Sequence, residues 1–316
     1  MRSSILASIL MLVACHKAST GDDTVVPDSA TLGEAAFTIT SSDFTLQPNQ
    51  EITICYYFHT PNTAALPINK WVSDMTPGSH HMIFFTGGPA HADGLDMTNN
   101  CGLGASTTNV SSWVFASQTP HTEELLPADD GAGKPLAQLI QPNTLGAFQM
   151  HYLNATDQPM TVHVKLSAYA LAAGAAYTQT DAYITYNQNI TIAPGAVNFP
   201  VTATCNAPSG KFWLMSTHAH KQAVKTEVFD GTTSLFSSTE WEHPGAKEWD
   251  ATPFYTMSTG KVTWTCTYTN TGDNAANTIT AGTSAQTNEM CMATGYYFPS
   301  TGPKICLNVA QGCFCQ

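Results

Sequence analysis

The sequence of 316 residues has few charged side chains and almost no arginine. Charged residues make up 11% of the chain, and 23 acidic residues against 11 basic ones give a formal net charge of −12. Such a chain repels nucleic-acid phosphates and shows no basic patch, so we expect no nucleic-acid binding. The one arginine is Arg2. The rest of the chain therefore has no guanidinium group for bidentate binding of a carboxylate.

Long apolar runs are also missing, since no segment reaches the roughly 18 apolar residues of a membrane-spanning helix. A basic start, an apolar stretch over residues 5–13 and the sequence Leu12-Val13-Ala14-Cys15 are typical of a secretory signal. Leu-x-Ala-Cys further resembles a bacterial lipobox, in which the cysteine becomes lipid-modified; the alternative is a plain signal peptide. We expect residues 1–15 to be a lipoprotein signal, with Cys15 lipidated. The mature chain would be exported and held at the bacterial outer membrane by its lipid anchor alone. It would lie on either the periplasmic side or the surface side of that membrane.

Helical periodicity is missing too, apart from a possible short turn at residues 135–140. Residues 16–35 are small, polar and acidic, which is typical of a flexible tether. Beyond them apolar residues recur at every second position, for example over residues 160–168 and 262–268. This period of two predicts half-buried strands.

Turn-forming pairs such as Pro48-Asn49 and Pro194-Gly195 separate these runs at intervals typical of strands. We therefore predict an all-β fold of two tandem antiparallel β-sandwich domains, jelly-roll-like in type. The alternation is lost over residues 171–182, where we place the boundary. The predicted N-terminal sandwich spans residues 36–176, and the C-terminal sandwich spans residues 177–316.

Cysteine is present in a number that indicates disulfides. Removing Cys15 from the nine cysteines leaves eight, and an even number in an exported chain favours disulfides over metal thiolates. Eight cysteines allow 105 pairings, so their count selects none of them. The eight are Cys55, Cys101, Cys205, Cys266, Cys291, Cys306, Cys313 and Cys315.

Five histidines and one methionine lie in four short groups whose side chains suit copper. Imidazole nitrogens bind copper in either oxidation state, whereas the thioether of methionine favours Cu(I). A set that mixes both ligands suggests copper that changes its oxidation state. The groups are His80–His81 in GSHHMIFF, His151 in FQMHYLN, His218 and His220 in STHAHK, and Met290 in NEMC.

The spacing of these groups predicts two metal sites. Residues two apart in a strand point to the same face, so His218 and His220 can share one ion. Adjacent histidines need a bend or a strand end, which the turn-forming residues 77–79 supply before the His80–His81 pair. The two predicted sites are His80, His81 and His151, and His218, His220 and Met290.

The order HHM, QMH, HxH and EMC, the last preceded by a Gly-Thr-Ser turn, resembles the copper type II, ascorbate-dependent monooxygenase family. This family includes peptidylglycine α-hydroxylating and dopamine β-monooxygenases, and the resemblance covers roughly residues 36–308. It implies an electron-transfer copper at the three histidines of the first sandwich. It implies an oxygen-binding copper at His218, His220 and Met290 in the second. Gln149 matches a glutamine that the family places near the path between the metals.

The resemblance also implies a disulfide pairing, namely Cys55–Cys101, Cys205–Cys306 and Cys266–Cys291. Cys313 and Cys315 are left over. A Cys-x-Cys bridge would be tight. We nevertheless expect a terminal disulfide between these two cysteines, and a second small metal site is the alternative.

The chain departs from the peptide-hydroxylating branch at positions that contact substrate. That branch has an arginine two residues before its His-x-His motif, where it clamps a peptide carboxylate; here this residue is Ser216. The asparagine and tyrosine that follow the methionine in the family are here Met292 and Thr294. The resemblance therefore implies the chemistry and leaves the substrate open.

We interpret the chain as a copper-dependent monooxygenase that uses O2 to hydroxylate a C–H bond of a small organic substrate. It would use two copper ions per chain and ascorbate or another one-electron donor. His218, His220, Met290 and Gln149 are the predicted catalytic residues. One alternative is a non-catalytic periplasmic or surface copper-binding lipoprotein, and another is an adhesion or interaction lipoprotein whose sites have decayed. The substrate, the donor and the oligomeric state are not indicated.

Overall fold

The computed structural model describes residues 33–97, 101 and 112–316, and the regular elements within them are all β-strands. The predicted all-β class is confirmed. None of the described segments is a helix long and apolar enough to cross a membrane. The predicted signal peptide with Cys15, and most of the tether at residues 16–35, lie outside the described residues.

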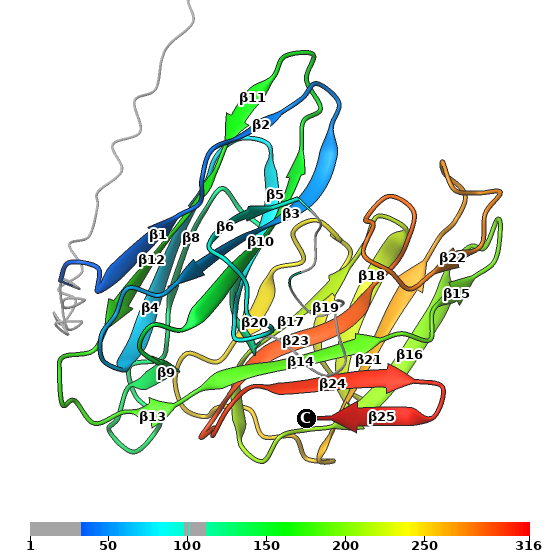
Figure 1. Cartoon of the computed structure of the whole chain (residues 1–316). Coiled ribbons are helices and arrows are strands. Elements are labelled where there is room, and N and C mark those ends of the chain that lie inside the picture. The colour runs from blue at the N-terminus through cyan, green and yellow to red at the C-terminus, as the bar shows by residue number, and fades with distance from the viewer. Residues whose placement is uncertain (1–32, 98–100, 102–111) are drawn as a thin grey trace, which may run out of the picture. The chain divides into compact units, whose positions relative to one another are not determined.

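Strands from the first half of the described chain form two sheets and a small ribbon (Figure 1). The first sheet is β1 (Phe37–Thr40), β12 (Val164–Ala170), β4 (Leu66–Met75), β9 (Leu136–Ile140) and β13 (Thr178–Gln179), with β8 (His121–Leu125) paired to β4. The second is β6 (Gly94–Asp96), β3 (Glu51–His59), β10 (Leu145–Leu153), β5 (Ser79–Thr86) and β7 (Ser112–Ser117). The ribbon is β2 (Phe44–Leu46) with β11 (Met160–Val162).

Strands from the second half form a comparable set. The larger sheet is β20 (Ala246–Glu248), β17 (Lys211–Ala219), β23 (Cys291–Phe298), β14 (Asp181–Asn187), β24 (Lys304–Val309) and β25 (Gly312–Cys315). The other is β16 (Phe199–Asn206), β21 (Lys261–Tyr268), β18 (Ala223–Asp230) and β19 (Thr233–Ser238), and β15 (Thr191–Ile192) pairs with β22 (Ile279–Thr280). Pairing is antiparallel except for β13 with β9 and β14 with β24.

Aromatic side chains fill the space between the sheets. In the first half Trp71 of β4 meets Phe84 of β5, with ring centroids 5.7 Å apart, because apolar residues at alternate positions share one face of each strand. The same core cluster also contains Trp213 and Tyr296 from the second half. Residues 34–316 form one compact unit. The division into domains at residues 36–176 and 177–316 thus stays a prediction.

One local prediction was wrong. Residues 135–140, expected as a possible helical turn, form strand β9 over Leu136–Ile140. The strand lies inside its sheet between β4 and β13, and Leu136, Ala137 and Gln138 are all buried. A strand covered on both faces loses the apolar–polar alternation that marks half-buried strands, so its period cannot be recognised in the sequence.

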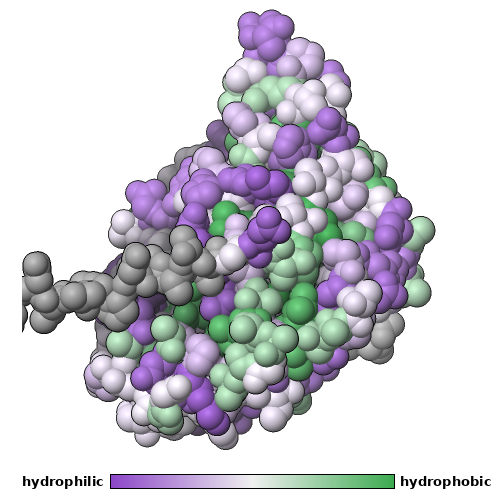
Figure 2. Space-filling model, turned by 90° about the vertical axis from the view of Figure 1, so that its left-hand side faces the viewer, coloured by the Kyte–Doolittle hydropathy of each residue, from purple (hydrophilic) through white to green (hydrophobic). Residues whose placement is uncertain are grey.

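The surface of the protein mixes hydrophilic and apolar residues on the face shown in Figure 2, as expected for a chain with little charge.

The disulfides agree with the expected pairing in two cases and differ in two. Cys55–Cys101 and Cys266–Cys291 form as predicted. The predicted Cys205–Cys306 and Cys313–Cys315 bridges are wrong, because the bonds are Cys205–Cys313 and Cys306–Cys315. The cause is β25, a hairpin partner of β24 that aligns Cys306 with Cys315 and lies beyond the part of the chain that resembles the family. The sulfurs of these four cysteines are all in disulfide bonds. None of them is therefore a free thiolate for the alternative second metal site.

Candidate metal centre

The first histidine group lies where β5 and β10 pair. His151 is directly opposite His81, and the register then shifts, so that Tyr152 is opposite Ser79 and His80 is an extra residue in β5. Such a bulge re-aims side chains, and it lets two adjacent histidines serve one centre. The expected irregularity is therefore present, directly after the turn at Gly78, whose φ is 92°. One ring nitrogen from each of His80, His81 and His151 lies within 4.8 Å of the others.

The ring orientations leave suitable nitrogens facing one another. Nδ1 of His80 lies 3.2 Å from Nδ1 of His81, a separation compatible with two ligands at metal–nitrogen distances of about 2 Å. Nε2 of His151 donates to Oε1 of Glu51 at 2.8 Å. This hydrogen bond fixes the His151 tautomer with an unprotonated Nδ1, because a neutral imidazole carries one N–H. In metal sites a carboxylate often accepts a hydrogen bond in this way from the far nitrogen of a metal-binding histidine, so Glu51 has the position that such a role would require.

The second group lies at the neighbouring ends of β17 and β23. Ala219 pairs with Cys291 at the end of this ladder, so His220 and Met290 occupy the adjoining positions. Nδ1 of His220 donates to the Asn288 carbonyl at 3.1 Å, which leaves its Nε2 unprotonated. His218 and His220 have ring centroids 5.4 Å apart. The alternation that predicted a shared face for these two histidines is thus present in the structure.

Glu289, next to Met290, connects the two strands of this group. Its carboxylate is fully buried and accepts backbone N–H groups from His220 at 2.9 Å and from Gln222 at 2.8 Å. Tyr268 donates its hydroxyl to the Met290 carbonyl at 2.7 Å. The Cys266–Cys291 disulfide restrains the next residue. The backbone that carries the thioether is therefore held from three sides.

Electrostatics favour neutral imidazoles in both groups. Burial, reinforced by neighbouring histidines, lowers the pKa of His80 to about 4 and that of His218 to about 3. Burial likewise lowers the pKa of His220 to about 4. At neutral pH the rings therefore keep unprotonated nitrogens, which metal binding requires. The residues present suit copper, since the donor set combines uncharged imidazoles with one soft thioether.

The two groups meet at one cavity of about 400 Å³. It is lined by His81 and His151 of the first group and by His218, His220 and Met290 of the second. The ring centroids of His81 and His218 are 5.9 Å apart. Six ligand candidates that are up to 210 positions apart in the sequence are thus brought together.

Gln149, which the resemblance predicts near the path between the metals, also lines this cavity. It lies on β10 opposite Cys55, and its Nε2 donates to the carbonyl of Cys101 at 2.9 Å. The Cys55–Cys101 disulfide therefore supports the position of Gln149.

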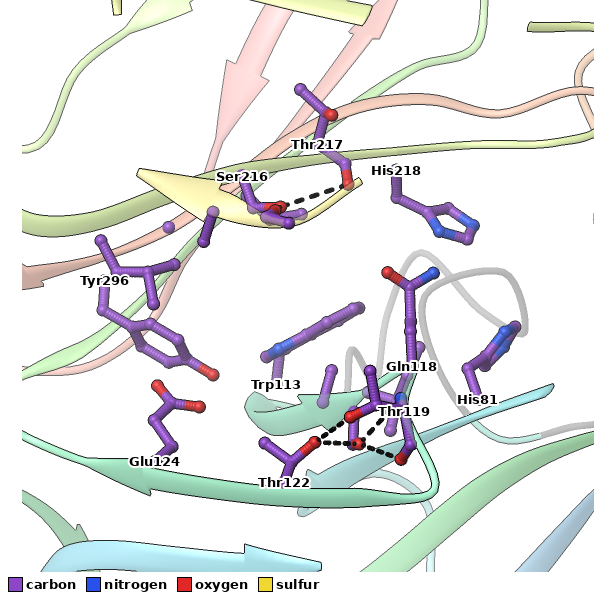
Figure 3. A pocket seen from close by; sticks show the side chains of 18 of the residues that line it. His81, Trp113, Gln118, Thr119, Thr122, Glu124, Ser216, Thr217, His218 and Tyr296 are labelled. Carbon is purple, nitrogen blue, oxygen red and sulfur yellow. Dashed lines mark hydrogen bonds between the residues drawn. The ribbon is translucent and has the colours of Figure 1, made fainter. Parts of the chain in front are cut away.

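A second cavity of about 490 Å³ adjoins the first and shares His81, His218 and Trp113 with it. In Figure 3 the two histidines lie at one end, Glu124 and Tyr296 lie at the other, and Trp113 is between them. Ser216, which the resemblance aligns with the arginine of the peptide-hydroxylating branch, lines this cavity together with Thr294. Its size is in the range of small-molecule pockets.

Of the other histidines, His243 lines the second cavity, whereas neither His91 nor His121 lines either cavity. Met82, Met150 and Met292 are buried.

The segment that carries His243 also approaches the first histidine group. Trp241 stacks on His80, with ring centroids 5.5 Å apart. Glu242 Oε1 lies 3.9 Å from Nε2 of His80. Sequence analysis missed this segment, Glu51 and Glu124, because no local pattern links them to the ligand groups.

No protein-family model matches the sequence, and no curated protein matches it. Among solved structures, the PBSX exported protein XepA is similar at 9% identity, over 83% of this chain and 86% of that chain, with a TM-score of 0.23. The major capsid protein P2 from bacteriophage PM2 is similar at 7% identity, over 84% of this chain and 100% of that chain, with a TM-score of 0.27. A chain from Sulfolobus Turreted Icosahedral Virus matches at 8% identity, over 81% and 59%, with a TM-score of 0.19. Similarity at this level carries no argument about function.

Proposed function

We propose that the chain is a copper-dependent monooxygenase that hydroxylates a C–H bond of a small organic substrate with O2 and ascorbate or another one-electron donor. One observation supports this most. The cavity that gathers both ligand groups adjoins a cavity of about 490 Å³, and both are lined by His81 and His218. A substrate in the second cavity could therefore contact the ligand groups directly.

Each ligand group has a different composition, which suits different tasks. His80, His81 and His151 would hold one copper ion, and His218, His220 and Met290 would hold the other. Bound copper would supply one-electron redox chemistry and O2 activation at the thioether-containing site.

The chain's own residues would orient these ligands and exclude water. Glu51 accepts the N–H of His151 at 2.8 Å, and Glu289 holds the backbone of His220 at 2.9 Å. Burial of His151 and His220, each about 5% exposed or less, keeps bulk water from the rings. A site closed in this way protects reactive species from side reactions.

The test is substrate-dependent oxygen incorporation. The copper-loaded mature chain would be incubated with ascorbate, ¹⁸O2 and a panel of small amines, alcohols and acids, followed by a metabolite extract of the producing organism. We expect oxygen uptake that depends on one class of compound, with one labelled oxygen atom in the product. His218→Ala should abolish this activity. His163→Ala is the matched control, because the His163 side chain is 39% exposed and pairs with Asp43 at 3.0 Å, and it lines neither cavity.

A copper-binding lipoprotein without turnover would use the same six ligands. It would bind copper yet give no labelled product with any compound, and its oxygen uptake would not depend on added substrate. That result would overturn the proposal in favour of this second function.

A further inference from the structure

The loop between β19 and β20 belongs to the second half of the chain but contacts a histidine of the first half. This loop, residues 239–245, carries Trp241 and Glu242, and both approach His80 of β5. The three histidines of the first group all come from β5 and β10. They therefore do not need the loop to come together, and its contact with His80 calls for a separate explanation.

Hydrogen bonds fix both ends of the 239–245 loop. At its start the Ser238 hydroxyl donates to the Glu240 carbonyl at 3.2 Å and accepts the Glu240 N–H at 3.1 Å. At its end the Ser216 hydroxyl donates to the Gly245 carbonyl at 2.5 Å, and Pro244 is buried. The loop therefore has a defined position beside the first histidine group.

One ring nitrogen of His80 is buried and has no partner. Its Nδ1 lies 3.2 Å from Nδ1 of His81, inside the ligand group, so its Nε2 points away from that group. Within the described part of the chain this Nε2 makes no hydrogen bond, although the side chain is only 11% exposed. A buried polar atom without a partner is costly, so it calls for a partner that can approach.

Glu242 offers a carboxylate within reach of this nitrogen. Its Oε1 lies 3.9 Å from Nε2 of His80, and its side chain is 44% exposed. A rotation of this side chain can therefore shorten the distance to the roughly 2.8 Å of a charge-assisted hydrogen bond. Trp241 covers one face of the imidazole, with ring centroids 5.5 Å apart and an angle of 24° between the planes. Glu51 makes a bond of this kind to Nε2 of His151, at 2.8 Å.

The position of the proton on His80 decides whether this ring can bind a metal. A neutral imidazole carries one N–H. If Nδ1 carries it, this nitrogen donates to Nδ1 of His81 at 3.2 Å and has no lone pair for a metal. If Nε2 carries the proton, Nδ1 is free to bind. A carboxylate at Nε2 stabilises the second form, because it accepts that N–H.

We propose that Glu242 is a positioning residue for the first histidine group: it accepts the Nε2–H of His80 and so holds the tautomer whose Nδ1 can bind metal. The inference rests on the proposed function only in placing copper at this group. Trp241 shields the bond from water. Ser216, which the resemblance aligns with a substrate-binding arginine, instead anchors the end of the loop that carries Glu242.

The first experiment reads the His80 tautomer in the metal-free full chain by long-range ¹H–¹⁵N NMR. We expect the Nε2–H form to predominate in wild type and the Nδ1–H form to gain population in Glu242→Ala. Glu242→Gln keeps an acceptor oxygen and should resemble wild type. Glu240→Ala is the matched control, because Glu240 is an exposed glutamate of the same loop that bonds to Ser238 through its backbone.

The second experiment measures copper affinity in the same variants by competition with a chromophoric chelator, with electron paramagnetic resonance to assign the site. Glu242→Ala should weaken binding at the first histidine group about tenfold, the lower end of the range for such partners, because the carboxylate is partly exposed. Glu242→Gln should stay within about threefold of wild type, and Glu240→Ala should equal it. The site that contains Met290 should keep its affinity throughout.

A wild-type His80 that carries its proton on Nδ1 would overturn the proposal. So would a tautomer ratio that Glu242→Ala leaves unchanged, or an equal loss of copper affinity in Glu240→Ala. The NMR measurement needs neither copper nor turnover, so it separates failure of this inference from failure of the monooxygenase proposal.

Discussion

Glu51→Ala should weaken copper binding at the first histidine group by about 10- to 100-fold, which corresponds to roughly 1.4–2.8 kcal/mol. The carboxylate accepts the Nε2–H of His151 at 2.8 Å and is the partner that fixes this ring's tautomer. Without it, His151 can present the wrong nitrogen and its basicity falls. Glu51→Gln keeps an acceptor oxygen at similar reach and loses only the charge, so its effect should be less than about tenfold.

The assay is competition for copper against a chromophoric chelator, with electron paramagnetic resonance to assign the occupied site. Glu227→Ala serves as the matched control, since Glu227 is a strand glutamate that lines neither cavity. The Met290 site should keep its affinity in all three variants. Unchanged copper affinity in Glu51→Ala, or an equal loss at both sites, would refute the orienting role of Glu51.

Two further predictions concern the cysteines. A fatty-acid analogue should label wild type and not Cys15→Ser, since the lipobox-like sequence makes Cys15 the lipidation site; equal labelling would exclude this. Replacing Cys266 and Cys291 by serine should lower copper affinity at the thioether site and largely spare the other, as spectra of both sites would show; unchanged spectra would count against it.

The fold class and the ligand groups could be predicted because they depend on local pattern. Alternation predicted the strand β21 at Lys261–Tyr268, and residue spacing predicted that His218 and His220 share a face. The need for an irregularity at His80 and His81 was predictable as well. Its form was not, because the bulge is defined by the pairing of β5 with β10, a contact between distant segments.

The features that could not be predicted from the sequence all depend on tertiary contacts. Four cysteine sulfurs lie within 4.8 Å of one another, so their pairing is decided by the β24–β25 hairpin and not by spacing. Glu51 meets His151 across 100 residues of sequence.

The central claim is that Met290 is a copper ligand beside His218 and His220. X-ray absorption at the copper edge of the reduced, copper-loaded chain tests it most directly. We predict a sulfur scatterer in wild type that Met290→His abolishes and His151→Ala retains, with Met290→His still binding close to two copper ions and losing nearly all oxygen insertion. A sulfur signal that neither substitution alters, or full turnover in Met290→His, would contradict the assignment.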